Sequence, residues 1–502
     1  MTGLIMVAGA LLAQSLFART YGANSFDQTS KVIQTDDGGY ILIGYSISFT
    51  SSYDAMILKL SPTGSLEWTK TYGGSAEDAS FGIAEGNDGN YFVLTRTRSY
   101  GVGNIDVLVT KFAPDGSLLW PKTYGWDLLE MPWSICEVPD GGAVIVGGTN
   151  SFDPYSMLIF KINSGGSLVW ARAATVAGKD GSEAYSIAST ADKGFAIAGI
   201  GVTTDYQTDS MDVIFVKTDS TGKTQWARAL RGNKYDWGLS VIQTPDHGFV
   251  VAGATPSSGE GGTDILVFKM DSAGSLEWAK TYGTSGEEMG YSIIQTSDTG
   301  YMVSAKLGYD DIGVLKISSD GSLEWAKTIQ GTGWDAGRSI IPTSDGYYLI
   351  TGETGSFGGA GQYDAFAIKL SQDGYPGCLQ NITLFEATAA MIFDTIDMLD
   401  TLVNLTTTSP TITPVSRTLT THDICPPSVE EGDRNHTAAI TCCWDCRGAK
   451  FVSSLECPIY IYNPDGRLAY SGQLRKGENR ISLERGVYLW RAGVYRGKAV
   501  VR

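Results

Sequence analysis

Short apolar runs separated by turn residues recur along most of the chain. Between residues 226 and 278 the runs are Ser240–Thr244, Phe249–Ala254, Asp264–Met270 and Leu276–Tyr282, joined by segments rich in Asp, Gly and Ser. Runs of five to seven residues between such turns predict β-strands, and four in succession predict one four-stranded sheet. A single sheet of this kind cannot bury both faces, so neighbouring copies must stack.

The four-run unit is repeated. The phrase Gly-Ser-Leu-Glu-Trp-x-Lys-Thr-Tyr-Gly ends in Trp68–Gly73, and degraded copies place a Trp at positions 120, 170, 226, 278 and 325. Phe17–Gly22 is a seventh copy, 51 residues before Trp68. Seven repeats of about 50 residues predict an all-β chain folded as a seven-bladed β-propeller over residues 14–378.

The phase of the repeat predicts how the ring closes. The last set of three runs ends at Leu370, and no Trp-x-Lys-Thr-Tyr run follows it. The missing fourth strand is the spare copy at Phe17–Gly22. We therefore expect this N-terminal strand to pair beside Asp364–Leu370 and to remove a free sheet edge.

These units resemble the bacterial propeller repeats of the form Trp-x-Lys-Thr-Tyr-Gly-Gly…Thr-x-Asp-Gly-Gly-Tyr…Gly…Asp-x-Leu-x-x-Lys, which occur in many exported proteins. The resemblance covers about residues 17–374. It implies the fold, but not a ligand.

Both ends of the chain suggest export. The apolar run Gly3–Ala13 is too short to span a bilayer and predicts a signal peptide over residues 1–13. No transmembrane segment is expected in the mature chain. The C-terminal residues Ile459–Arg467, Asn479–Leu483 and Lys498–Arg502 predict the strands of a small β-sandwich over residues 431–502.

This tail resembles the C-terminal sorting domain of type IX secretion substrates. The shared elements are an Asp-Gly-Arg turn, a Gly-Val-Tyr strand start and a terminal Lys-x-Val-Val; they fall here on Asp465, Gly466, Arg467, Gly486, Val487, Tyr488 and Lys498. The resemblance implies a secretion machinery as partner, and a secreted or outer-cell-surface location. Between the two domains, residues 379–430 are rich in Thr and Pro and predict an extended linker.

Charge and cysteine content narrow the function classes. The net charge of −17 argues against a nucleic-acid partner. We expect a monomer.

Cys136 is predicted to be a buried free thiol. The other six cysteines predict up to three disulfides of undetermined pairing, although Cys443 and Cys446 also have the spacing of a zinc or redox site. The six are Cys378, Cys425, Cys442, Cys443, Cys446 and Cys457.

The third run of each unit carries a regular polar pair. An Asp opens this run in six of seven units, with Ser156 as the exception, and a Lys follows five positions later in all seven. This repetition predicts a structural network in which the Asp binds turn amides and the Lys pairs across blades.

Candidate binding residues fall in loops that share one propeller face. The aromatic set on this face is Trp126, Trp133, Tyr235, Trp237, Tyr309 and Trp334. One acid precedes each first run: Asp27, Asp78, Glu130, Glu183, Asp236, Glu288 and Asp335. Acids with exposed aromatics suit sugar stacking or Ca²⁺, and no other cofactor is indicated. The alternative is that the acids cap local backbone amides.

Two function classes remain. The first is a binding or adhesion module for a glycan, a protein or a surface. The second is a glycan-active hydrolase or lyase that uses paired carboxylates of the acidic ring. Catalysis requires one asymmetric cluster, whereas these acids recur evenly, and the three histidines of the chain offer no triad or metal motif. The sequence therefore favours binding and names no catalytic residue.

Overall fold

The computed structural model describes residues 16–152, 154–179, 181–203, 211–308, 310–357, 362–374, 379–403 and 405–424, with the backbone of seven further strands between residues 440 and 501. The chain divides into two units, Met1–Cys425 and Pro426–Arg502. Among the described residues, no helix is long and apolar enough to cross a membrane.

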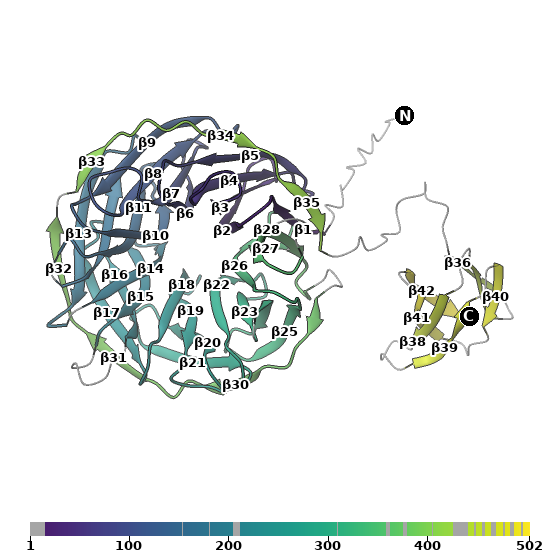
Figure 1. The fold of residues 1–502 in the computed structure, drawn as a ribbon. Helices are drawn as coiled ribbons and strands as arrows, with labels where there is room; N and C mark the ends of the chain where they lie inside the picture. The colour runs from purple at the N-terminus through teal and green to yellow at the C-terminus, as the bar shows by residue number, and fades with distance from the viewer. Residues whose placement is uncertain are drawn as a thin grey trace, which may run out of the picture. The chain divides into compact units, whose positions relative to one another are not determined.

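The first unit is a seven-bladed β-propeller, as predicted (Figure 1). The inner strands are β2 (Asp27–Gln34), β6 (Asp78–Glu85), β10 (Glu130–Glu137), β14 (Ser182–Ser189), β18 (Trp237–Gln243), β22 (Met289–Gln295) and β26 (Asp335–Pro342). The second strands are β3 (Tyr40–Ser46), β7 (Tyr91–Thr97), β11 (Ala143–Thr149), β15 (Phe195–Gly201), β19 (Phe249–Thr255), β23 (Tyr301–Leu307) and β27 (Tyr348–Thr354).

The third strands are β4 (Asp54–Leu60), β8 (Asp106–Phe112), β12 (Ser156–Ile162), β16 (Asp212–Thr218), β20 (Asp264–Met270), β24 (Asp311–Ile317) and β28 (Asp364–Leu370). The fourth strands are β5 (Leu66–Tyr72), β9 (Leu118–Gly125), β13 (Leu168–Val176), β17 (Thr224–Arg231), β21 (Leu276–Gly283), β25 (Leu323–Ile329) and β1 (Ala18–Gly22). Each of these four lists gives the strands in the order of blades 1 to 7.

The N-terminal strand closes the last blade. β1 pairs antiparallel with β28, with Tyr21 opposite Ala365 and Ala18 opposite Ile368. The prediction from the phase of the repeat is confirmed.

The repeated Trp docks each blade onto the next. The third-to-fourth-strand turn contains a glycine with positive φ, and a Cβ on this glycine would collide with the Trp of the preceding blade. At Gly166, where φ is 75°, the Trp120 ring would lie 2.7 Å from such a Cβ. Phe17 takes the Trp position against Gly64 of blade 1. The same contact therefore runs around the whole ring, including its closure.

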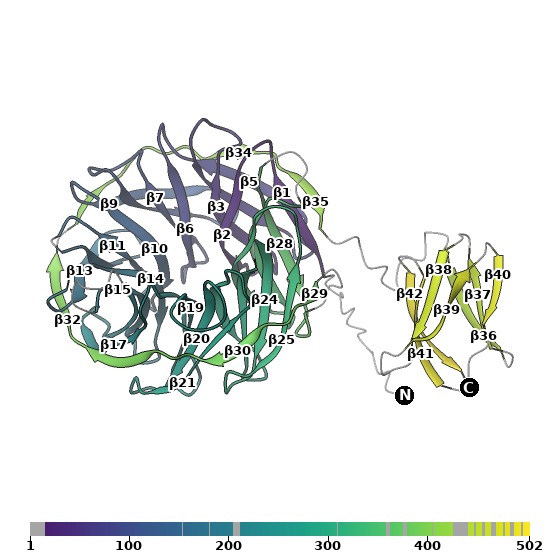
Figure 2. The same ribbon diagram turned by 60° about the horizontal axis from the view of Figure 1, so that its bottom comes forward.

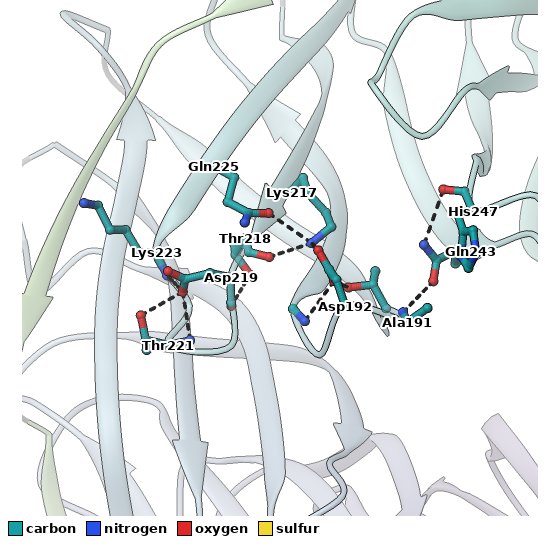
Figure 3. A network of polar contacts seen from close by, with 12 residues as sticks. Ala191, Asp192, Lys217, Thr218, Asp219, Thr221, Lys223, Gln225, Gln243 and His247 are labelled. Carbon is teal, nitrogen blue, oxygen red and sulfur yellow. Dashed lines mark hydrogen bonds and ion pairs between the residues drawn. The ribbon is translucent and has the colours of Figure 1, made fainter.

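The hairpin between the first two strands is held by a Thr–Asp–Lys network, shown for blade 4 in Figure 3. Lys217 Nζ lies 2.8 Å from Asp192 Oδ2, and Thr190 donates its hydroxyl to the same carboxylate. The third-strand Lys pairs with the hairpin Asp of its own blade in all seven blades. The expected pairing across blades is wrong, because the ammonium reaches the turn of its own sheet first.

Every blade has a fifth strand from a segment that we call the belt, residues 380–423. The belt strands are β29 (Gln380–Asn381), β30 (Phe385–Thr388), β31 (Ile392–Ile396), β32 (Met398–Val403), β33 (Thr406–Thr408), β34 (Val415–Arg417) and β35 (Thr420–Asp423). They pair with the fourth strands of blades 6, 5, 4, 3, 2, 1 and 7 in that order. The belt thus runs around the outside of the ring against the direction of the blades (Figures 1 and 2).

A seven-residue apolar repeat anchors the belt. Its members are Leu384, Met391, Met398, Leu405, Ile412 and Leu419. Each is buried or half-buried and packs into a different hydrophobic cluster between two adjacent blades. Seven extended residues span about 23 Å, so one heptad crosses one blade. The structure corrects the linker prediction for residues 379–430, because their described part pairs with the otherwise open edge of each blade.

The second unit contains two antiparallel sheets. One comprises β36 (Ile440–Asp445), β37 (Gly448–Ser453) and β40 (Gly477–Ile481); the other comprises β38 (Cys457–Tyr462), β39 (Leu468–Leu474), β41 (Gly486–Ala492) and β42 (Tyr495–Val501). This agrees with the predicted small β-sandwich. Gly486, Val487 and Tyr488 begin β41, and Lys498 in β42 lies opposite Leu489. Asp465, Gly466 and Arg467 lie outside the described residues.

Candidate functional site

All seven inner strands carry a β-bulge at the same position. In blade 1 the pairing with β3 shifts between Thr29 and Lys31, which leaves Ser30 unpaired, and the other blades repeat this shift. A bulge re-aims the side chain of its extra residue. The inner strands surround the propeller axis (Figure 1). The extra residues, which we call the axial ring, are Ser30, Phe81, Trp133, Tyr185, Leu239, Tyr291 and Arg338.

Three aromatic residues of the axial ring, together with Tyr45 of β3, form a continuous arc across four blades. The ring centroids lie 6.3 Å apart for Tyr45 and Phe81, 5.1 Å for Phe81 and Trp133, and 5.4 Å for Trp133 and Tyr185. All three bulge residues are half-buried, which leaves part of each ring exposed. Exposed aromatic faces with polar edges are the surfaces on which sugars stack.

Glu183 lies at one end of this arc and accepts three hydrogen bonds from aromatic side chains. Trp133 Nε1 donates at 2.6 Å and Tyr155 Oη at 2.9 Å, both to Oε1; Tyr185 Oη donates to Oε2 at 3.2 Å. Burial, together with Glu183, raises the pKa of Tyr155 and of Tyr185, so both phenols stay protonated donors at neutral pH.

A charged pair lies on the other side of the axial ring. Arg338 and Glu353 form a bidentate ion pair, with Nη2–Oε1 at 2.6 Å and Nε–Oε2 at 3.1 Å. The Arg338 guanidinium also lies 4.2 Å from the centre of the Tyr291 ring. The seven-fold repeat therefore has a strongly asymmetric centre, with the aromatic arc in blades 1 to 4, and Tyr291 of blade 6 beside an ion pair in blade 7.

The predicted aromatic set is only partly gathered at this centre. Trp133 belongs to the axial ring. Trp334 donates Nε1 to Glu353 at 3.3 Å, and Tyr235 stacks on Trp237 at the start of the inner strand of blade 5. Trp126 packs edge-on against Phe152. Tyr309 lies outside the described residues.

Six of the seven predicted ring acids are fully buried: Asp27, Asp78, Glu130, Asp236, Glu288 and Asp335. Their oxygens accept hydrogen bonds from nearby backbone amides and from Ser and Thr hydroxyls. Asp27, for example, accepts from Ala23 N at 2.7 Å, Ser46 Oγ at 2.5 Å and Ser48 Oγ at 2.8 Å. This geometry favours the capping interpretation.

Burial raises the pKa of the ring acids Asp27, Asp78, Asp236 and Asp335, and that of Asp236 reaches about 6. Among the described side chains, no group of three or more His, Cys, Asp or Glu could hold a metal ion. Ca²⁺ binding at these acids is the untested alternative to capping.

Glu183 is the exception, because the equivalent of Asp27 in blade 4 is Ser182. Ser182 lies opposite Gly201 in the pairing with β15, as Asp27 lies opposite Ser46. Glu183 therefore occupies the next position along the strand, whose side chain is half-buried near the axial ring. Because the acids are evenly spaced along the sequence, the sequence alone did not show that Glu183 lies one position beyond the equivalent of Asp27.

Third-strand carboxylates approach the ring acids across blade boundaries. The fourth strand of blade 2 ends at Gly125, where an added Cβ would lie 1.9 Å from Asp106 Oδ1 and 2.8 Å from Glu130 Oε2. Burial, with Glu130 nearby, raises the pKa of Asp106 to about 6. The same arrangement with Glu288 raises the pKa of Asp264 to about 7. The terminal Gly of the repeat is required because the two acids fill the space of a side chain.

The cysteine predictions are tested in one place only. Cys136 is a free thiol, half-buried rather than fully buried, and burial raises its pKa to about 12. Cys378, Cys425 and Cys446 lie outside the described residues. Cys442 and Cys443 lie in β36 and Cys457 in β38, in a region where only the backbone is described.

Sequence reasoning missed Phe81, Tyr185, Tyr291 and Arg338. The sequence contains a signal for them, because each lies three positions after the residue of its blade that is equivalent to Asp27. Ser30 and Leu239, at the same position of blades 1 and 5, are small or aliphatic. The spacing of the ring acids alone does not show that this position matters.

Comparison with known proteins adds no family. No protein family model and no curated protein matches the chain. Solved structures with similar folds include Sqt1 from Chaetomium thermophilum (11% identity, 71% of this chain and 98% of that chain, TM-score 0.39). Another is puromycin hydrolase (13%, 70% and 55%, 0.41). A third is an extracellular domain assigned to a hybrid two-component system of B. thetaiotaomicron (11%, 95% and 56%, 0.35). Similarity at this level carries no argument about function.

Proposed function

We propose that the propeller is the ligand-binding module of an exported protein and that a saccharide binds at the axial ring. The observation that carries this proposal is the aromatic arc from Tyr45 to Tyr185, which ends at Glu183. A sugar ring can stack on the half-exposed faces of Phe81 and Trp133, and the Glu183 carboxylate can accept hydrogen bonds from sugar hydroxyls.

Binding is favoured over the alternative of a glycan-active hydrolase or lyase. That alternative needs a pair of carboxylates with access to substrate. Six of the predicted ring acids are fully buried and bonded to local donors. Glu353 is held in its ion pair with Arg338. The axial centre is therefore better suited to recognition than to acid–base chemistry.

A glycan array with the full chain tests the binding proposal. Phe81→Ala and Trp133→Ala should each weaken the strongest interaction at least about tenfold, since stacking is lost. Phe385→Ala is the matched control, because Phe385 is an exposed aromatic residue of the belt. Equal binding by the wild type and the two axial variants would refute the axial site.

The same proposal includes export by the C-terminal domain. Its support is the resemblance of the tail to type IX sorting domains and the strand that begins at Gly486. Deletion of residues 431–502 leaves the belt intact and should leave a folded propeller retained in the periplasm of a type IX-competent host. Efficient secretion of this truncated chain would contradict the sorting role.

A further inference from the structure

Beside the aromatic arc, Arg96 has no carboxylate partner of its own among the described residues; Glu77, whose charge also acts on it, is paired with Arg98. Arg96 lies in β7 opposite Ala79, and its Cζ is 5.3 Å from the centre of the Phe81 ring. The side chain is half-buried. In the part of the chain that the structure describes, no carboxylate lies within ion-pair distance of its guanidinium. Arginine keeps its charge under all ordinary conditions.

Three other cations nearby are paired. Arg98, two residues further along and more exposed, has Glu77 Oε2 at 3.2 Å from its Nε. Arg338 is paired with Glu353, and Lys306 lies 3.5 Å from Asp310. Removing a charge from water is costly unless a counter-charge replaces the hydration. Arg96 therefore differs from Arg98, Arg338 and Lys306, which each have a counter-charge.

Among the described residues, Lys31 in the neighbouring blade is a second cation without an ion-pair partner. Lys31 follows the bulge residue Ser30, at a position that is serine in blades 3 to 7. Where Ser186 and Ser240 occupy it, their hydroxyls accept from the inner strand of the following blade, at 3.1 and 3.2 Å. Position 31 therefore faces blade 2, which carries Phe81 and Arg96. Burial lowers the pKa of Lys31 to about 8.

These two positive charges stand out because the whole chain has a net charge of −17. The aromatic arc has opposite charges at its ends, with Arg96 beside Phe81 and Glu183 beside Trp133 and Tyr185. A ligand stacked on the arc would meet a cation at one end and a hydrogen-bond acceptor at the other. That polarity suits a sugar chain with an anionic group and free hydroxyls.

We propose that the axial site binds an acidic saccharide, stacked on Phe81 and Trp133, with its carboxylate or sulfate paired to Arg96. This inference rests on the proposed function and specifies its ligand class. Glu183 at the far end repels a second anionic group and so sets the direction in which the saccharide lies.

Isothermal titration of the full chain with three probes tests the inference: a galacturonic acid hexasaccharide, a sulfated galactan hexasaccharide and neutral cellohexaose. At least one acidic probe should bind at least about tenfold more tightly than cellohexaose, with an affinity that falls as salt rises. The two acidic probes distinguish a carboxylate ligand from a sulfate ligand.

Arg96→Gln should weaken the acidic probe at least about tenfold and leave cellohexaose unchanged, while Arg96→Lys should recover part of the loss. Arg98→Gln is the matched control and should change neither. Thermal unfolding of each variant checks the fold. Equal loss for acidic and neutral probes, or no loss for Arg96→Gln, overturns the acidic ligand; if Trp133→Ala still abolishes binding, the saccharide site stands. Failure of all three probes to bind overturns both.

Discussion

The packing of the belt on the propeller can be tested sharply, because the belt contains one buried and one exposed residue of the same type. Leu405 is 8% exposed and packs in the cluster between blades 2 and 3, together with Tyr124 and Ala171. Leu402, three residues earlier in β32, is 64% exposed. If the belt is part of the propeller, these two leucines should differ strongly when they are shortened to alanine.

The size of the difference follows from burial. Replacing a buried leucine by alanine costs about 2–5 kcal/mol, the sum of lost burial and of the cavity left behind. Leu405 lies at the periphery, where neighbours can partly collapse into the space, so we expect about 2–3 kcal/mol for Leu405→Ala. Exposed substitutions usually stay within about 0.5 kcal/mol, and Leu402→Ala should do so.

Urea unfolding, followed by the fluorescence of the propeller tryptophans, measures both variants on the full chain. We expect a lower midpoint for Leu405→Ala with an unchanged slope, and no change for Leu402→Ala. Equal midpoints for both variants and the wild type would mean that residues 379–430 act as a linker. The packing of the belt on the blades would then be refuted.

Three further results are expected. Gly166→Ala should cost about 2–3 kcal/mol, because it strains a φ of 75° and collides with Trp120, whereas Gly89→Ala, with φ of 70° and open space, should cost about 1 kcal/mol in the same urea experiment. Stability should be greatest near pH 4. Raised carboxyl pKa values such as about 7 for Asp264 favour folding below the unfolded pKa of about 4, and that contribution is lost as pH rises through 7. The third-strand lysines lower the pKa of the hairpin carboxylates, to about 2 for Asp192; this contribution to stability is present above pH 4 and is lost as pH falls toward 2. Asp264→Asn should therefore flatten the decline toward pH 8, and an unchanged decline would contradict this assignment. Finally, thermal unfolding with Ca²⁺ and with chelator should give the same midpoint, since the buried ring acids are bonded to local donors; a bound ion at 100 times its dissociation constant would instead add about 2.7 kcal/mol.

The blades could be predicted from the sequence because their determinants are local. A Thr–Asp–Gly hairpin, an Asp–Gly turn and alternating apolar residues form the same sheet wherever they occur, and a Trp that needs a glycine partner recurs with every copy. The number of copies and their phase then determine the seven-fold ring and its closure by Phe17–Gly22. The closure does join residues far apart in the chain, such as Ala18 and Ile368, but the phase of the repeat already indicates this pairing.

The axial site could not be predicted from the sequence, because it depends on how the strands pair. Whether Glu183 or Ser182 matches Asp27 is decided by the register of β14 against β15, and a shift of one residue sends a side chain to another face. The bulge that brings Phe81, Trp133 and Tyr185 together also exists only in the paired sheet. Spacing along the sequence could therefore identify Trp133 as a candidate, but not the arc to which it belongs.

The belt shows most clearly what the sequence alone left open. A composition of Thr, Pro and scattered aliphatic residues is compatible with a linker and with a set of edge strands, because both are extended. The deciding factor is the unpaired outer edge of each blade, which offers backbone partners only once the ring has formed. The seven-residue spacing from Leu384 to Leu419 is visible in the sequence, but it acquires a meaning only against a ring of seven blades, because each heptad covers the distance from one inter-blade core to the next.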